Sequence, residues 1–367
     1  MASTDRPTIR IHSTEDLLAL IPFILGFQPD ASLVLVAING GGVPFTARVS
    51  LPTTPESSAA LPAALEVVTA KLKPFDGVSV VLVGYGPADP VQKAVATATE
   101  AMQDAGIPVR ETLCVADGRF WRLDGSGPVD GTAFDPSESP VTATAVYAWL
   151  VALPDRDALA ATLAPVTGEA RDRMVAATAM TCEFLVELLE AARADTTTSG
   201  ESGDDSDGDP DTALHTPLGL ALQKAARTYL IQAQDSYRSG RPVGDDPAAA
   251  LTVLLDLPSL RSFAARRTSG EEWQIEMWTD LVRRAEPPFT AGPATMLALS
   301  ALQAGRATLA SVAIDRALDT DPGDRFAHLL AGVVAAGIDP DTVTALLATW
   351  SAPETAPGRR HRDGATG

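Results

Sequence analysis

A serine and an arginine near the start of the chain are residue types that could bind a small anion. Ser32 follows the turn sequence LGFQPDA and begins an apolar run, and Arg48 lies in the next apolar stretch. A guanidinium presents a planar fork of donors that matches a carboxylate or a phosphate, although surface arginines often form only weak ion pairs. Because no GxSxG pattern and no nearby histidine accompany Ser32, the alternative to a binding hydroxyl is a turn or capping hydroxyl rather than a nucleophile.

A short GYG sequence is the second candidate for anion binding. An expected strand runs into Gly84, Tyr85 and Gly86, and an expected helix begins just after them, so backbone amides could point at an anion there. The sequence lacks the GxGxxG and GxxxxGK[ST] patterns, and the alternative is a turn that needs positive φ. Arg119 and Trp121 could complete a polar pocket. The predicted ligand-binding residues are Ser32, Arg48, Gly84, Tyr85, Gly86, Arg119 and Trp121, and no catalytic residue is assigned.

Cysteine and histidine usage predicts no metal site and no cofactor. The chain has two cysteines, Cys114 and Cys182, without a CxxC spacing, and its four histidines are scattered. Both thiols are expected in the core. The order DxDxD at Asp205 to Asp209 resembles part of a calcium loop, but the glycine and the closing glutamate of that loop are missing.

Charge and hydropathy limit the partners. The formal net charge of -19 should repel nucleic acid and anionic membranes, so a protein partner, of basic character, is expected. The apolar run from Leu17 to Phe27 is interrupted by Pro22 and is shorter than the roughly 20 residues of a membrane span. The start, MASTDRP, lacks the basic patch of a signal peptide, which predicts a cytoplasmic protein. The sequence sets no oligomeric state.

Strand and helix signals alternate in the first part of the chain, which predicts a layered α/β domain with a mixed sheet in the order βαββαβαββ. The runs SLVLVAI and VSVVLV are almost wholly apolar, as in central strands, whereas the strand from Phe45 to Leu51 alternates and is expected near an edge. The expected strands are 8–11, 32–38, 45–51, 78–83, 109–115 and 119–123, and the expected helices are 14–20, capped by Ser13 or Thr14, 55–73 and 90–105.

The later part of the chain predicts helices only, at 142–153, 168–193, 217–237, 247–256, 259–267, 271–285, 293–304, 308–318, 325–336 and 340–350. One pair of them fits the tetratricopeptide spacing partially. Small residues stand at Ala298, Ala310 and Ala317, with Leu297 and Ile314 beside them, but the tryptophan and aromatic positions are absent. Either a tetratricopeptide-like hairpin or an ordinary helical pair is expected, with Thr308 facing solvent.

Composition divides the chain into four segments. Residues 195–211 hold seven acids and no large apolar residue, which predicts a disordered acidic linker. The expected segments are 1–194, the α/β domain with trailing helices; 195–211, the linker; 212–352, an all-helical domain; and 353–367, a disordered tail.

Several motifs together resemble a known family. They are LIPFILGFQPDASLVLVAI, ARVSLP, DGRFW, MWTDLVRRA and ALQAGRATLASVAIDRALDTDP. On these the chain resembles the actinobacterial family catalogued as domain of unknown function 4192. The resemblance implies a bacterial cytosolic protein and no established activity.

Two functions therefore stay open. The first is a non-catalytic adaptor or regulatory protein whose helical domain offers a groove to a partner. The second is an enzyme or sensor for a small anionic metabolite near Ser32, Arg48 and residues 84–86.

Overall fold

A glycine turn pairs the first two strands of a mixed sheet. The computed structural model describes residues 9–52, 54–147, 152–198, 217–336, 342–343 and 345. Strands β1 (Ser32–Asn39) and β2 (Gly42–Ser50) are antiparallel, with Val34 opposite Arg48. Gly40 and Gly41 between them have φ of 58° and 87°, a conformation that favours glycine. The predicted hairpin is confirmed.

The sheet has six strands among the described residues, in the order β2-β1-β3-β4-β5-β6. β3 (Ser79–Tyr85) is antiparallel to β1 and parallel to β4 (Val109–Ala116), and β5 (Arg119–Arg122) and the short β6 (Thr132–Ala133) follow as antiparallel neighbours. The mixed sheet, its wholly apolar inner strands and the edge position of β2 agree with the sequence. β6 was not predicted.

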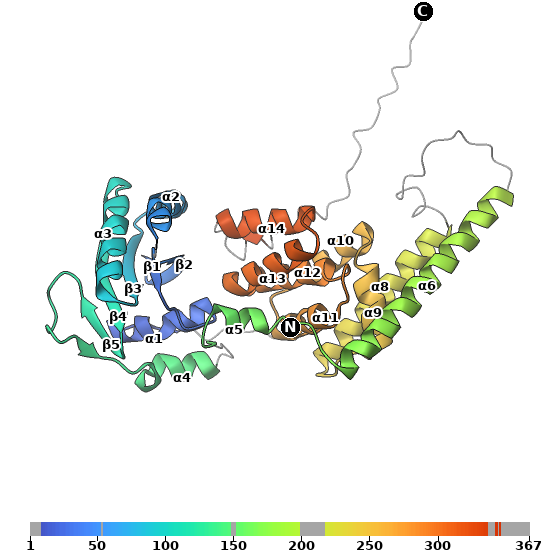
Figure 1. The fold of residues 1–367 in the computed structure, drawn as a ribbon, viewed down its shortest axis with the longest axis horizontal. Helices are drawn as coiled ribbons and strands as arrows, with labels where there is room; N and C mark the ends of the chain where they lie inside the picture. The colour runs from blue at the N-terminus through green and yellow to red at the C-terminus, as the bar shows by residue number, and fades with distance from the viewer. Residues whose placement is uncertain are drawn as a thin grey trace, which may run out of the picture.

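Helices cover both faces of this sheet (Figure 1). α2 (Pro55–Leu72) and α3 (Ala88–Asp104) pack on one face, where Leu33, Leu35 and Leu82 join their core. α1 (Thr14–Leu25) packs on the other face with Val34, Val83 and Phe120. The alternation of side chains along each strand sends successive residues to these two cores.

The first element is a helix and not the strand predicted at residues 8–11. Ile9 to Ile11 form no strand, and Thr8 lies outside the described residues. The backbone N–H of His12 donates to Asp16, and the Ser13 hydroxyl caps α1, so the chain turns directly into the helix. α1 continues through Pro22 to Leu25, beyond the expected end at Leu20, and stops at Gly26, whose φ is 81°.

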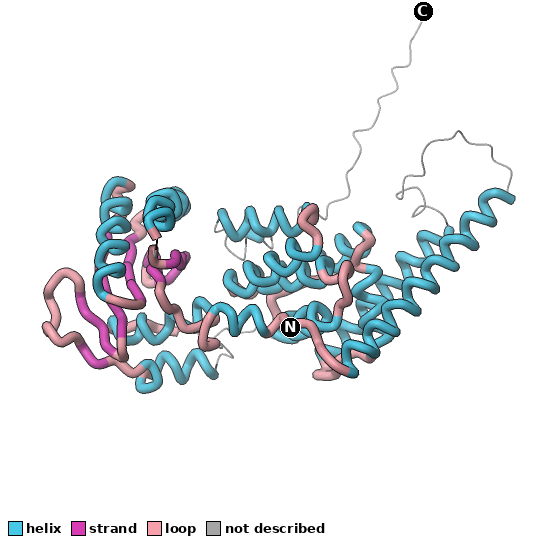
Figure 2. The backbone as a smooth tube through the Cα atoms, in the orientation of Figure 1, coloured by secondary structure: helices cyan, strands magenta, loops and turns pink. Residues whose placement is uncertain are grey.

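Helices make up the rest of the described chain, and Figure 2 shows the strands confined to one end of the molecule. Most of the predicted helices are confirmed within a few residues at their ends, while the six-residue α5 was not predicted. The observed helices after the sheet are a 3-10 turn, η1 (Pro136–Glu138), and α4 (Pro140–Tyr147), α5 (Arg156–Ala161), α6 (Glu169–Thr198), α8 (Pro217–Arg238), α9 (Asp245–Leu254), α10 (Pro258–Arg267), α11 (Glu272–Arg284), α12 (Ala291–Gln303), α13 (Ala307–Thr320) and α14 (Arg325–Ala336).

The long helix α6 packs on α9 of the helical part and not on the sheet. Met174 and Ala177 of α6 are buried. The trailing helix that the sequence assigned to the segment 1–194 therefore packs with the later helices, because its apolar face contacts α9. α6 also includes Asp195 to Thr198, the first residues of the expected linker. The remainder of the expected linker, the tail 353–367 and most of the helix predicted at 340–350 lie outside the described residues.

α12 and α13 form a closely packed helical hairpin turned by Gly305, which has φ of 75°. Ala298, Ala310 and Ala317 are fully buried, so small residues line the place where the helices meet. The hairpin is confirmed as a helical pair, and its likeness to a tetratricopeptide unit stays a prediction. Thr308 is half-buried and lines a small cavity against α1, so its expected solvent-facing position is wrong.

Among the described residues no single helix is long and apolar enough to cross a bilayer, although α9 and α10 meet those criteria together as a pair bent by 110°.

Candidate functional site

Ser32 and Arg48 are in direct contact at one end of the sheet. The Arg48 Nε donates to the Ser32 hydroxyl oxygen at 2.8 Å, and the Ser32 hydroxyl donates to the Asp30 carbonyl at 2.5 Å. The register of the hairpin explains the contact: Arg48 lies opposite Val34, two residues along β1 from Ser32 and on the same face of the sheet. The structure thus brings together the first two predicted site residues.

The Arg48 guanidinium is a partly buried cation without a carboxylate at ion-pair distance among the described residues. It stacks 5.5 Å from the centre of the buried Phe27 ring. Burial lowers the pKa of Arg48, the nearby charge of Arg156 lowers it further, and Asp30 partly opposes them. Arginine nevertheless stays protonated, so a positive charge is held in place at this end of the sheet.

Tyr85 lies opposite Ser32 in the sheet, so its side chain points to the same face. The side chain is buried, and its hydroxyl has no hydrogen-bond partner among the described residues. Burial raises the pKa of the Tyr85 phenol, which therefore stays neutral and able to donate. Tyr85 and Arg48 thus lie on the same face of the sheet, on the two strands that flank β1.

The two glycines of the GYG sequence have structural roles in the sheet. A Cβ at Gly84 would lie 2.2 Å from a Val91 methyl, so glycine is required for α3 to approach the sheet. Gly86 has φ of 130°, and its N–H donates to the Val115 carbonyl at 3.1 Å. The Gly86 amide is therefore already used, and the anion site expected at Gly84 to Gly86 stays a prediction.

Arg119 and Trp121 do not join Ser32. Tyr85 pairs with Val115 and Val115 pairs with Phe120, so Phe120 lies on the same face of the sheet as Ser32. Arg119 and Trp121 flank Phe120 and therefore stand on the opposite face. Arg119 donates to the carbonyls of Asp130 and Gly131 at 2.7 and 3.0 Å, and Trp121 Nε1 donates to the Val129 carbonyl at 3.2 Å. They hold the loop before β6.

A polar network in the helical part was missed from the sequence. The Arg284 guanidinium donates to Asp280 at 3.0 Å and to Asp245 at 2.8 Å, Tyr237 donates to Asp280, and Arg173 donates to Asp245 at 2.9 Å. It joins α6, α8, α9 and α11. The motif MWTDLVRRA places Asp280 and Arg284 on one helical face, which was the available signal. Since each charge has a partner, the network is structural.

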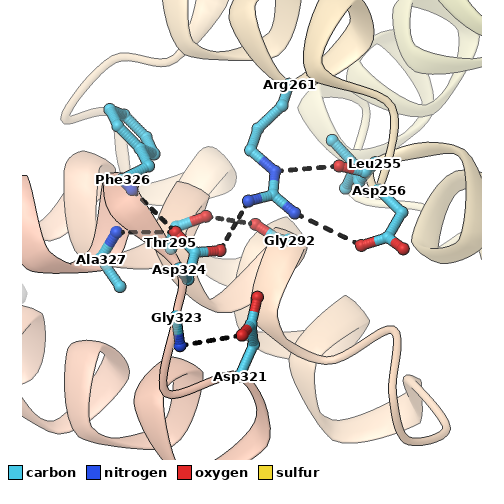
Figure 3. A network of polar contacts seen from close by, with 10 residues as sticks. All are labelled: Leu255, Asp256, Arg261, Gly292, Thr295, Asp321, Gly323, Asp324, Phe326 and Ala327. Atoms are coloured by element: carbon cyan, nitrogen blue, oxygen red, sulfur yellow. Dashed lines mark hydrogen bonds and ion pairs between the residues drawn. The ribbon is translucent and has the colours of Figure 1, made fainter. Parts of the chain in front are cut away.

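A second network joins α10 to α14 (Figure 3). Arg261 pairs with Asp324 at 2.5 Å and donates to the Leu255 carbonyl at 3.0 Å. The other oxygen of Asp324 accepts from the N–H groups of Phe326 and Ala327 and so caps α14. No group of His, Cys, Asp and Glu side chains in the described ranges could hold a metal ion.

These features define a two-part protein, in which a mixed sheet with a partly buried arginine joins a bundle of helices. A family model matches residues 15–341, most of the chain. The chain belongs to the family described as Domain of unknown function (DUF4192). No curated protein and no solved structure matches it.

Proposed function

We propose that this chain is a non-catalytic binding protein of adaptor or regulatory type, acting in the cytoplasm, whose helical part binds a basic amphipathic segment of another protein. The carrying observation is a pair of exposed apolar side chains beside a row of acids on α6. Met180 is 66% exposed and Phe184 is 61% exposed, and both are of a size that soluble proteins usually bury.

The spacing on α6 makes this a defined surface. Met180 and Phe184 are four residues apart and therefore neighbours on the helix, and the exposed residues Glu183, Glu187 and Glu190 form a parallel row beside them. We call these five residues the α6 surface. α6 packs on α9, and its Met174 and Ala177 are buried, whereas the five residues of the α6 surface are exposed.

The chemistry of the α6 surface specifies the partner. Burying the two apolar side chains against a partner would contribute about 1.5 to 3 kcal/mol each. The three glutamates add a negative potential that favours a lysine- or arginine-rich partner and speeds its association. A basic amphipathic helix laid along α6 satisfies both requirements.

The state of Ser32 supports binding over catalysis. Its hydroxyl accepts from Arg48 and donates to a backbone carbonyl, so it faces a cation and a peptide oxygen. A serine nucleophile needs a base that accepts its proton. The contacts of Ser32 instead hold the turn at Asp30, before β1, in place.

A labelled amphipathic helical peptide of leucine and lysine tests the proposed function with the full-length chain. Fluorescence anisotropy should show saturable binding, whereas the matched peptide with glutamate in place of lysine should not bind. Equal binding of both peptides, or of neither, contradicts the proposal.

A second candidate function, a sensor for a small anionic metabolite, is favoured by the partly buried Arg48 and by the Tyr85 hydroxyl, which has no hydrogen-bond partner in the described part of the chain. Specific binding to the folded state raises the melting temperature by mass action. Phosphate and succinate should stabilise the wild-type chain and should not stabilise Arg48→Gln, while Arg110→Gln, an exposed arginine on β4, should respond as the wild type does. Equal responses of all three proteins exclude this site.

A further inference from the structure

A cleft of about 350 Å³ lies between α5 and α13. Its volume is at the lower end of the range of about 300 to 1,000 Å³ found for small-molecule sites. The apolar lining includes Ala160, Leu163 and Val312, while both helices contribute charged residues to it. An apolar floor with a few polar groups is the usual composition of a ligand site.

The charges in the cleft are only partly neutralised. Arg156 of α5 pairs with Asp315 of α13 at 2.8 Å across the cleft. Arg316 and Asp319 also line the cleft and make no ion pair with other described residues. The Nε of Arg316 is buried and has no hydrogen-bond partner among the described residues, so this guanidinium is only partly satisfied by the protein.

We propose that this cleft binds a small zwitterion with an aliphatic body, that is, an aliphatic α-amino acid. Its carboxylate accepts from the Arg316 guanidinium, a planar cation that can offer donors to both oxygens. Its ammonium group lies near Asp319, which is three residues further along the same face of α13. Its side chain covers Leu163 and Val312.

The site is separate from both sites of the proposed function. It uses neither the α6 surface nor the contact of Arg48 with Ser32. Because α5 follows the sheet in the chain and α13 belongs to the helical hairpin, a ligand here contacts both parts of the molecule (Figure 1).

Isothermal titration of the full-length chain with L-leucine tests the proposal. We expect saturable binding at millimolar concentration, and weaker binding of 4-methylpentanoate and 3-methylbutylamine, each of which lacks one of the two charges. Arg316→Gln should weaken leucine binding about ten- to a hundredfold, as expected for loss of a charged hydrogen bond. Arg266→Gln, an exposed arginine of α10 outside the cleft, should bind as the wild type does.

Asp319→Asn provides a second variant at an exposed position, where folding should be unaffected. It should reduce leucine binding and leave 4-methylpentanoate binding unchanged. Absence of leucine binding, equal binding of leucine and 4-methylpentanoate, or leucine binding that Arg316→Gln does not change would overturn the proposal. Leucine binding that is lost in Arg48→Gln and kept in Arg316→Gln would also overturn it, by placing the ligand at the sheet.

Discussion

Arg261 on α10 and Asp324 at the start of α14 form an ion pair of 2.5 Å in which the aspartate side chain is fully buried and that of the arginine is 19% exposed. Asp324 also caps α14 through its other oxygen. One carboxylate thus performs two tasks, joining two helices and starting one of them.

Loss of this carboxylate should be costly. Asp324→Ala leaves a buried guanidinium without its partner, and we expect a loss of about 3 to 5 kcal/mol in the free energy of unfolding. Asp324→Asn should lose less because its amide oxygen still caps the helix. The exposed Asp256, 3.5 Å from the same arginine, should change stability by less than about 0.5 kcal/mol on replacement by alanine. Urea denaturation measures all three, and similar losses for Asp256 and Asp324 would contradict the described geometry.

Gly26 should not tolerate a branched side chain. Its φ of 81° lies in the left-handed region, although the space around an added Cβ is open apart from Leu159 at 3.9 Å. Gly26→Val should therefore lose about 1 to 3 kcal/mol through backbone strain alone. Gly332→Ala is the control, because Gly332 has an open environment within a helix. This substitution should leave the stability of the protein unchanged or increase it. Thermal unfolding with no loss in Gly26→Val would mean an ordinary turn.

A larger side chain where α12 and α13 meet should destabilise the protein. Ala310→Leu inserts a side chain at a fully buried position and should cost about 1 to 3 kcal/mol. Ala307→Leu makes the same change at an exposed position on α13 and should stay within about 0.5 kcal/mol. Thr308 is unsuitable as the control because it is half-buried and lines a cavity against α1. Equal small effects in urea denaturation would show that Ala310 does not face α12.

Acid should weaken the helical part through Asp245. The hydrogen bond from Arg173, and then the charge and hydrogen bond of Arg284, hold the pKa of Asp245 below its usual value despite some desolvation. Since the folded-state pKa is depressed, the stabilisation is present above about pH 4 and is lost as the pH falls through the folded-state value. Between neutral pH and about pH 3, the melting temperature of Arg173→Gln should therefore fall less than that of the wild type. An identical loss would exclude this contribution, and Arg266→Gln provides the control.

Local signals predicted the elements that local interactions determine. The hydroxyl of Ser13 predicted the start of α1, and the NGGG turn predicted the hairpin that places Arg48 beside Ser32, whereas the end of α1 at Leu25, before Gly26, was placed too early at Leu20. The strand expected at residues 8–11 failed because an apolar run of that length forms a strand only where a neighbour pairs with it.

Relations between distant residues could not be predicted in the same way. The face of Arg119 and Trp121 depends on the register between β4 and β5, which follows from the whole sheet. The amphipathic pattern of α6 indicates a buried face but not the helix that covers it. Arg261 and Asp324 are 63 residues apart, and only the packing of α10 and α14 brings them together.

Replacement of one exposed side chain tests the central claim most directly. Phe184→Ser removes the largest apolar group of the α6 surface, and Val67→Ser makes a similar change at a 51% exposed position on α2. We predict that Phe184→Ser weakens binding of the labelled leucine and lysine peptide about tenfold or more, and that Val67→Ser leaves it unchanged. Binding of equal strength in the wild type and both variants, measured by fluorescence anisotropy, would contradict the account.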